Sequence, residues 1–131
     1  MIVVQKDKYG CFIACIAMVT GKSYDEIKSM FPFDINENRG ADEFTQRSLL
    51  FELGYISQTF YETIAHTQKK REWPMKPFAS WHIVSVITKA NTPHVVFMDK
   101  NGLLIDPLDG DCKSFEDYSK INHIIAIWKK P

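Results

Sequence analysis

The chain has 131 residues, and its charges balance: lysine plus arginine and aspartate plus glutamate each number 16. With 45% hydrophobic and 24% charged residues, the composition is that of one soluble globular domain that can bury a core without disulfides or a metal. The neutral balance argues against a protein that binds nucleic acid or a membrane surface through bulk charge. No run approaches the roughly 18 apolar residues of a transmembrane helix.

The N-terminal residues and the cysteines indicate a reducing compartment. Residues 1–8 lack a basic region followed by a long apolar one, so we expect no secretory signal and a cytoplasmic protein. The three cysteines, an odd number, favour free thiols over a disulfide framework. Cys11 and Cys15 are separated by three residues, but no second cysteine or histidine pair has a comparable spacing. We therefore expect no zinc site, no other metal and no cofactor.

The first half of the chain, about residues 1–55, has a helical pattern. The expected helices lie at 11–20, between Ser23 and Pro32, and from about Asp42 to Leu53, with a polar loop at 36–40. Residues 11–20 are apolar on nearly every side, which is typical of a buried central helix. Ser23 and Glu26 form a capping box at the start of the second helix. Gly21 and Gly54 are natural ends for the first and third helices.

The second half, about residues 56–131, changes to a strand pattern. The expected strands are 56–61, 78–88, 94–99, 103–106 and 121–128, with a loop or frayed helix end at 68–77 and a short helix within 111–120. The two strands around residues 100–102 form a hairpin. Helices followed by a run of strands indicate one α+β domain, residues 1–131, in which a helical part packs on an antiparallel sheet.

The first helix begins at a cysteine, a favourable place for a nucleophile. Unpaired backbone N–H groups and the helix dipole favour the thiolate of Cys11, and Gly10 lets the chain bend before it. Gln5 lies six positions earlier, where its amide can stabilise an oxyanion together with the backbone N–H of Cys11. Taken alone, Cys11 is also compatible with a core position and Gln5 with an exposed one. We expect Cys15 to pack beneath Cys11, and Cys112 has no assigned role.

His94 is the candidate general base among four histidines. It follows Pro93, opens a strand and precedes a hairpin that carries a carboxylate, Asp106. The other histidines, His66, His82 and His123, have no such partner in the pattern. Asp106 would accept a hydrogen bond from the imidazole and fix its tautomer and orientation. The alternative is an ordinary turn aspartate before Pro107.

The hairpin register decides between these two interpretations of Asp106. A two-residue turn would place His94 and Asp106 on opposite faces of the sheet. A three-residue loop, 100–102, places Val96 opposite Asp106 and makes His94 a diagonal neighbour of Asp106 on one face. Gly102 suits the left-handed position of such a bulged loop. A catalytic role for Asp106 therefore predicts the three-residue form.

Together these motifs resemble the C39 peptidases, a papain-like group of cysteine peptidases. The matching features are Gln5 and its spacing to Cys11, residues 14–19, and the segments around His94 and Asp106, in the family's order along nearly the whole chain. The best-known members are the leader-peptide-cleaving domains of bacteriocin-exporting transporters. The resemblance implies a papain-like fold and a Cys11–His94–Asp106 triad assisted by Gln5.

The sequence also departs from the family's pattern. The family often has aspartate before the cysteine and glycine after it, where this chain has Gly10 and Phe12. Phe12 raises the question of the site's shape beside the nucleophile. We expect a stand-alone domain without the transporter, so the exporter role is not implied, and cleavage after a double-glycine leader is only one possible choice of substrate.

Three functions fit these residues. The leading hypothesis is a cysteine peptidase that hydrolyses a peptide bond in a protein or peptide substrate. An amidase or acyl transferase would use the same triad with another acceptor. A catalytically silent papain-like module would instead bind an inhibitory or target protein partner, and the aromatic residues in 72–74 and 78–81 would serve such a surface, a substrate groove or ordinary packing. The basic run 69–71 is most simply a solvated segment, so no nucleic-acid or membrane partner is expected.

Overall fold

The computed structural model describes residues 1–31, 42–61 and 79–131. In this part of the chain three α-helices occupy the expected positions: α1 (Cys11–Thr20), α2 (Tyr24–Ser29) and α3 (Glu43–Glu52). Several features expected from the sequence lie outside the described residues. They are the helix end at Pro32, His66, the loops at 36–40 and 68–77, the basic run 69–71, and the aromatic residues in 72–74 and at Phe78.

Local signals in the sequence set the ends of the helices. The Ser23 side chain accepts from the Glu26 N–H, and the Glu26 side chain accepts in return from the Ser23 N–H, so the predicted capping box of α2 is present. Gly21 ends α1 in the left-handed conformation, with φ 75°, and its N–H donates to Ala17 O at 2.9 Å. The Asp42 side chain accepts from the Thr45 N–H and begins α3.

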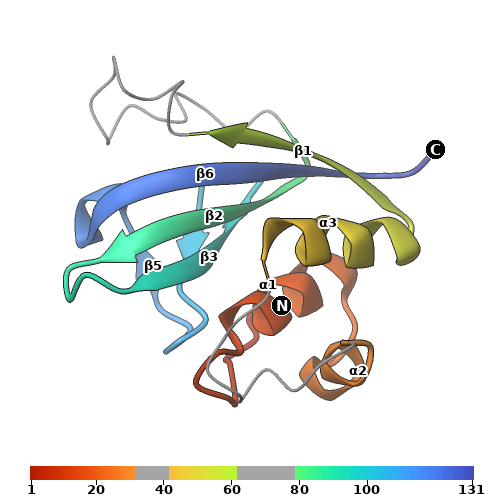
Figure 1. Cartoon of the computed structure of the whole chain (residues 1–131), viewed down its shortest axis with the longest axis horizontal. Helices are drawn as coiled ribbons and strands as arrows, with labels where there is room; N and C mark the ends of the chain where they lie inside the picture. Colours follow the sequence, from red (N-terminus) through yellow and green to blue (C-terminus); the bar gives the residue numbers. More distant parts are fainter. Residues whose placement is uncertain (32–41, 62–78) are drawn as a thin grey trace.

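The strands form one antiparallel sheet in the order β1-β6-β2-β3-β4-β5. Their bounds are β1 Tyr55–Tyr61, β2 Trp81–Thr88, β3 Pro93–Asp99, β4 Leu104–Ile105, β5 Cys112–Lys113 and β6 Tyr118–Lys129. The last strand, β6, lies between β1 and β2, so the first and second strands are neighbours only through it (Figure 1).

Two details of the strand-rich half differ from the expected pattern. The short helix expected near residues 115–118 is present as the 3₁₀ helix η2 (Phe115–Asp117), but the residues before it form an unexpected strand, β5, which pairs with β4. The final strand begins at Tyr118, before the expected start at Ile121, because Tyr118 pairs with Thr88 at the end of β2. Both differences arise from pairing with distant strands, which the local pattern of residues 111–120 does not contain.

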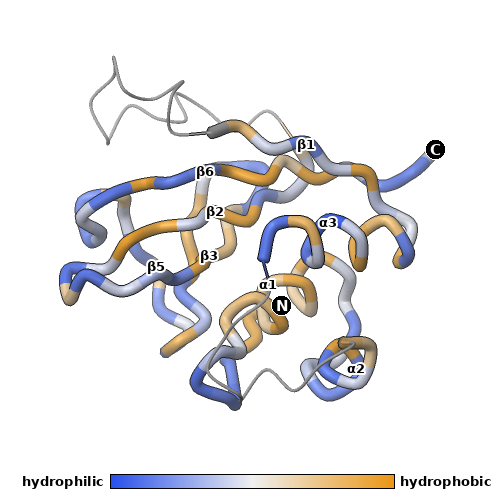
Figure 2. The backbone as a smooth tube through the Cα atoms, viewed as in Figure 1, coloured by the Kyte–Doolittle hydropathy of each residue, from blue (hydrophilic) through white to orange (hydrophobic). Residues whose placement is uncertain are grey.

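The helices lie on one side of the sheet, and α1 is the central one (Figure 1). Figure 2 shows that α1 is mostly hydrophobic, and the side chains from Phe12 to Val19 are buried. They pack in one core cluster with strand residues that include Ile83 and Phe97. Alternate strand residues, such as Val84 and Val96, form a second buried cluster on the other face of the sheet. The predicted arrangement, a buried central helix on an antiparallel sheet, is confirmed.

No helix within the described ranges is long and apolar enough to cross a membrane.

Candidate active site

The β3–β4 hairpin has the register that brings His94 and Asp106 onto one face. Phe97 pairs with Ile105 and Met98 pairs with Leu104, so the loop between the strands is the three-residue form that places Val96 opposite Asp106. The Asp99 N–H donates to Leu103 O at 3.1 Å, which closes this loop. Gly102 has φ 86°, the left-handed conformation that the bulged loop requires. The predicted three-residue hairpin is therefore confirmed.

His94 and Asp106 are joined by a short hydrogen bond. The His94 Nε2 and Asp106 Oδ1 atoms lie 2.7 Å apart, and only 11% and 9% of the two side chains are exposed. Since Nε2 is occupied by Asp106, the Nδ1 atom of His94 is the ring nitrogen left to face another group. This is how a carboxylate fixes the orientation of an imidazole.

Tyr118, a residue to which the sequence assigned no role, also holds Asp106. Its hydroxyl donates to Asp106 Oδ2 at 2.8 Å, and the Leu108 N–H donates to Oδ1 at 2.9 Å. Burial alone would raise the pKa of Asp106, but the hydrogen bonds from His94, Leu108 and Tyr118 lower it below its usual value. The carboxylate is therefore ionised at neutral pH with donors on both oxygens.

Cys11 meets His94 at the start of α1. Gly10 is the N-cap of this helix, and the Cys11 side chain is partly exposed while the rest of α1 up to Val19 is buried. Burial would lower the pKa of His94, but hydrogen bonds to Asp106 and to Cys11, together with electrostatic interactions with both residues, raise that pKa to about 9. His94 is therefore an imidazolium at neutral pH, with a carboxylate on one side and the Cys11 sulfur on the other.

Gln5 reaches the same region but is turned toward its own loop. Its backbone N–H donates to Pro107 O at 2.7 Å, which places it next to Asp106. Its Nε2 donates to Asp7 O at 2.9 Å and to Lys8 O at 3.3 Å. The Gln5 Oε1 atom is buried without a hydrogen-bond partner. The expected oxyanion donor is thus close to the site, with both amide hydrogens directed at loop carbonyls.

The side chains around Cys11 are core residues. Phe12 is 2% exposed, and its ring packs edge-on against Phe31 with centroids 5.6 Å apart. Its side chain therefore packs in the core. Cys15 is fully buried, as expected, and burial followed by the charges of Cys11 and Asp106 raises its pKa well above its usual value. The buried thiol stays protonated and packs beneath the site.

The remaining histidines and cysteine that the structure describes lie outside this cluster. His82 is fully buried in β2, and its ring accepts from the Ala79 N–H at 3.3 Å. His123 is in β6, where it pairs with Tyr61 of β1. Cys112 is exposed in β5. Among the described residues there is no group of three or more histidine, cysteine, aspartate or glutamate side chains placed to hold a metal ion.

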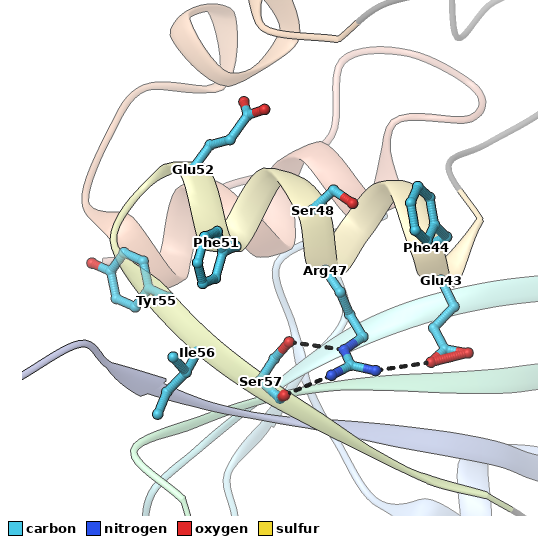
Figure 3. Close-up of a pocket in the computed structure, with 9 residues that line it drawn as sticks. All are labelled: Glu43, Phe44, Arg47, Ser48, Phe51, Glu52, Tyr55, Ile56 and Ser57. Atoms are coloured by element: carbon cyan, nitrogen blue, oxygen red, sulfur yellow. Dashed lines mark hydrogen bonds and ion pairs between the residues drawn. The ribbon is translucent and has the colours of Figure 1, made fainter.

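A separate groove of about 670 Å³ lies between α3 and β1. Its lining includes Phe44, Phe51 and Ile56, which are exposed, and Arg47, which donates to Ser57 O at 2.8 Å (Figure 3). None of the four predicted site residues lines this groove. The candidate active site at the start of α1 is therefore separate from this groove.

Comparison with known proteins places this geometry in a known fold. No family model and no curated protein matches the sequence. Among solved structures, the peptidase domain of Streptococcus ComA, a bifunctional ABC transporter of a quorum-sensing pathway, has 15% identity and a TM-score of 0.71, over 98% of this chain and 97% of that one. The chain has the fold of a C39 peptidase domain.

A second solved structure is similar over the whole chain. It is a double-glycine motif protease from an AMS/PCAT transporter in complex with the leader peptide, with 12% identity and a TM-score of 0.68, covering 100% of this chain and 91% of that one. In the C39 peptidase fold of the present chain, Cys11 is at the start of α1, His94 is near the start of β3, and Asp106 directly follows β4. These segments are distant in the sequence, and the fold brings them together.

Proposed function

We propose that the protein is a cysteine peptidase in which Cys11 is the nucleophile, His94 the acid and base, Asp106 the group that orients His94, and Gln5 an oxyanion donor. The observation that carries the proposal is the buried hydrogen bond between His94 and Asp106, with the other side of the imidazole facing Cys11. The C39 peptidase fold supports the same reaction class. A similar protease was solved in complex with a leader peptide, so we expect a peptide substrate.

The first half-reaction uses the Cys11–His94 pair. The Cys11 sulfur bonds to the carbonyl carbon of the scissile peptide, and the electron pair of the C=O bond moves onto the oxygen. Collapse of this intermediate breaks the C–N bond, and the departing amine takes the proton from the His94 imidazolium. The product is a thioester on Cys11 and a neutral His94 that Asp106 holds in place.

Hydrolysis of the thioester completes the cycle. A water molecule gives a proton to His94 and bonds to the thioester carbon, and Cys11 leaves as a thiolate beside the restored imidazolium. During both steps the oxyanion accepts from the backbone N–H of Cys11 and from Gln5 Nε2. We propose that Gln5 exchanges its longer bond, to Lys8 O, for the oxyanion and keeps its bond to Asp7 O.

Thiol labelling provides an internal test of the nucleophile. Cys112 is exposed and Cys11 only partly so, so accessibility alone predicts that Cys112 reacts faster with iodoacetamide. An activated Cys11 should instead be alkylated first at pH 7, by at least roughly tenfold, and His94→Ala should remove that advantage. Peptide mapping by mass spectrometry measures both rates in one sample. Alkylation of Cys11 no faster than Cys112 would count decisively against the proposal.

Peptide turnover tests the reaction itself. Cys11→Ala should abolish cleavage of a mixed peptide pool while leaving the circular dichroism spectrum unchanged. Identifying the group that attacks the thioester distinguishes a hydrolase from an acyl transferase. Attack by water gives a carboxylate, whereas attack by another amine gives a new amide. Labelled Cys11 without turnover, and protein partners that are retained after Cys11→Ala, would indicate an interaction module instead.

A further inference from the structure

We infer that Asp7, Tyr24 and Lys28 form a positioning device, here named the α2 clamp, through which helix α2 fixes the Gln5 amide beside the nucleophile. The inference rests on the proposed function of Gln5. It assigns a role in the site to a helix that contributes none of the four proposed catalytic residues.

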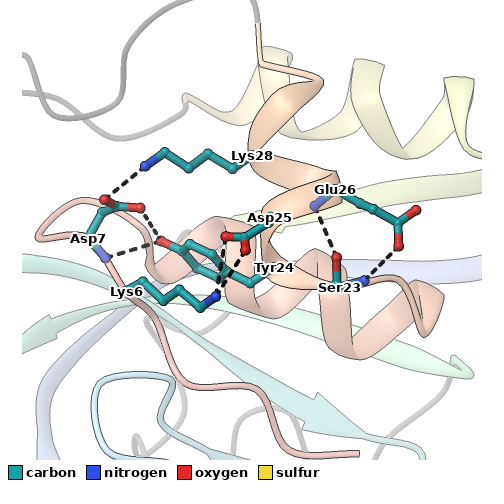
Figure 4. A network of polar contacts seen from close by, with 7 residues as sticks. All are labelled: Lys6, Asp7, Ser23, Tyr24, Asp25, Glu26 and Lys28. Carbon is teal, nitrogen blue, oxygen red and sulfur yellow. Dashed lines mark hydrogen bonds and ion pairs between the residues drawn. The ribbon is translucent and has the colours of Figure 1, made fainter.

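The clamp is a dense set of polar contacts around one aspartate (Figure 4). The Tyr24 hydroxyl donates to Asp7 Oδ2 at 2.7 Å and accepts from the Asp7 N–H at 3.2 Å. Lys28 Nζ lies 3.0 Å from Asp7 Oδ1. Tyr24 is 4% exposed and the Asp7 side chain is 13% exposed, so the contacts between Tyr24 and Asp7 are shielded from water, whereas Lys28 is partly exposed. Burial and the bond to Asp7 raise the pKa of Tyr24, which therefore stays a donor at all ordinary pH values.

The other side of Asp7 holds the proposed oxyanion donor. The Asp7 carbonyl accepts from Gln5 Nε2 at 2.9 Å and from the Gly10 N–H at 3.0 Å. Gly10 is the N-cap of α1, directly before Cys11. One residue, Asp7, therefore connects α2, through its side chain and N–H, to the Gln5 amide and the start of α1, through its carbonyl. A shift of Asp7 must move the Gln5 amide, because their bond is the shorter of the two that Gln5 Nε2 makes.

The clamp also explains the glycine at position 10. A Cβ atom on Gly10 would lie 1.9 Å from the Tyr24 hydroxyl oxygen, far inside van der Waals contact. Gly10 has φ −92°, a value open to any residue, so the constraint is space and not backbone conformation. The Tyr24 hydroxyl occupies the volume of a side chain at position 10. The Tyr24 hydroxyl thus leaves no room for the acidic residue that often precedes the cysteine in C39 peptidases.

Steady-state kinetics test whether the clamp acts through Gln5. Tyr24→Phe keeps the ring and removes both hydroxyl contacts, so it should lower kcat by roughly tenfold with KM unchanged, since small misplacements of a catalytic group are costly. In a Gln5→Ala background the same substitution should change kcat less than about twofold, because the positioned group is already absent. An undiminished loss in that background would overturn the inference.

Two further variants guard against a general loss of structure. Lys28→Met removes only the ion pair to Asp7 and should give a smaller loss of kcat in the same direction. Asp25→Asn is the matched control, because it breaks the exposed Lys6–Asp25 pair between the same loop and helix, at 3.2 Å, without touching Asp7. It should leave kcat and KM unchanged. If Tyr24→Phe fails to fold, Lys28→Met provides the test by itself: a lower kcat would support the inference, and an unchanged kcat would overturn it.

A readout that needs no turnover separates this inference from the proposed function. In ¹⁵N-labelled protein, Tyr24→Phe should shift the Gln5 side-chain amide resonances and speed exchange of the Gly10 amide by roughly tenfold. Asp25→Asn should do neither. Unchanged Gln5 and Gly10 signals would refute the clamp even in an active enzyme. Changed signals in a protein without any turnover would leave the clamp standing and refute the peptidase.

Discussion

Removal of the Tyr118 hydroxyl tests the arrangement around Asp106 most directly. Tyr118 is 3% exposed, and its hydroxyl donates to Asp106 Oδ2 while His94 and the Leu108 N–H bond to Oδ1. Tyr118→Phe keeps the ring in the second core cluster, to which Tyr118 belongs, so the loss of packing is small. The change therefore isolates one hydrogen bond to a buried carboxylate.

The expected cost follows from the charge on the acceptor. A hydrogen bond to a charged group contributes about 1.5–3 kcal/mol, whereas a neutral one contributes about 0.5–1.5 kcal/mol. Because hydrogen bonding keeps Asp106 ionised despite its burial, Tyr118→Phe should lower the free energy of unfolding by about 1.5–3 kcal/mol at pH 7. In an Asp106→Asn background, where the acceptor is neutral, the same change should cost only about 0.5–1.5 kcal/mol.

Urea unfolding followed by tryptophan fluorescence measures this difference. With a slope of about 2 kcal/mol per molar urea, the midpoint should fall by roughly 1 M and the slope should stay constant. Tyr55→Phe is the control, because Tyr55 is 8% exposed and its hydroxyl makes no hydrogen bond to the described part of the chain. Two results would refute the reasoning. One is a loss of unfolding free energy for Tyr118→Phe that equals the loss for Tyr55→Phe. The other is a loss for Tyr118→Phe that is just as large in the Asp106→Asn background.

Three further predictions concern pH and backbone conformation. Burial lowers the pKa of His82 and of His123 below 6.5, so the unfolded state binds protons at a higher pH than the folded state does. The free energy of unfolding should therefore fall as the pH drops from about 6.5 to 5. A urea midpoint that stays constant over this pH range would contradict this prediction. Because the pKa of His94 is raised to about 9, kcat/KM should fall as pH rises through about 9. Asp106→Asn should move this fall to lower pH, and an unmoved profile argues against their coupling. Gly21 has φ 75°, so Gly21→Ala should lower the free energy of unfolding, measured with urea, by about 1–2 kcal/mol. Gly21→Asn should lower it less, because asparagine tolerates the left-handed conformation better. Equal losses for the two variants would contradict this reasoning.

The features that the sequence predicts well are those with a local cause. The capping box of Ser23 and Glu26, the end of α1 at Gly21 and the bulged loop at Gly102 each depend on a few neighbouring residues. The resulting hairpin register is sufficient to place His94 beside Asp106. This part of the candidate site needs only the loop length and the alternation of side chains along a strand.

The features that the sequence does not reveal depend on distant partners. Tyr118 belongs to the site because β6 pairs with β2 and turns its hydroxyl toward Asp106, and nothing in residues 115–121 indicates this. The orientation of the Gln5 amide depends on the Asp7 carbonyl, which α2 holds in turn. Phe12 likewise gives no sign of its direction until Phe31 is found against it. These are outcomes of tertiary packing.

The position of β6 in the sheet sets the order in which the molecule can assemble. Because β6 pairs with β1 on one side and β2 on the other, β1 has no sheet partner among the described strands until β6 has been synthesised. Cys11 is synthesised long before Tyr118, which begins β6. Folding therefore waits for contacts between distant segments, which slows it. The hydrogen bond from Tyr118 to Asp106 can therefore form only after β6 has been synthesised.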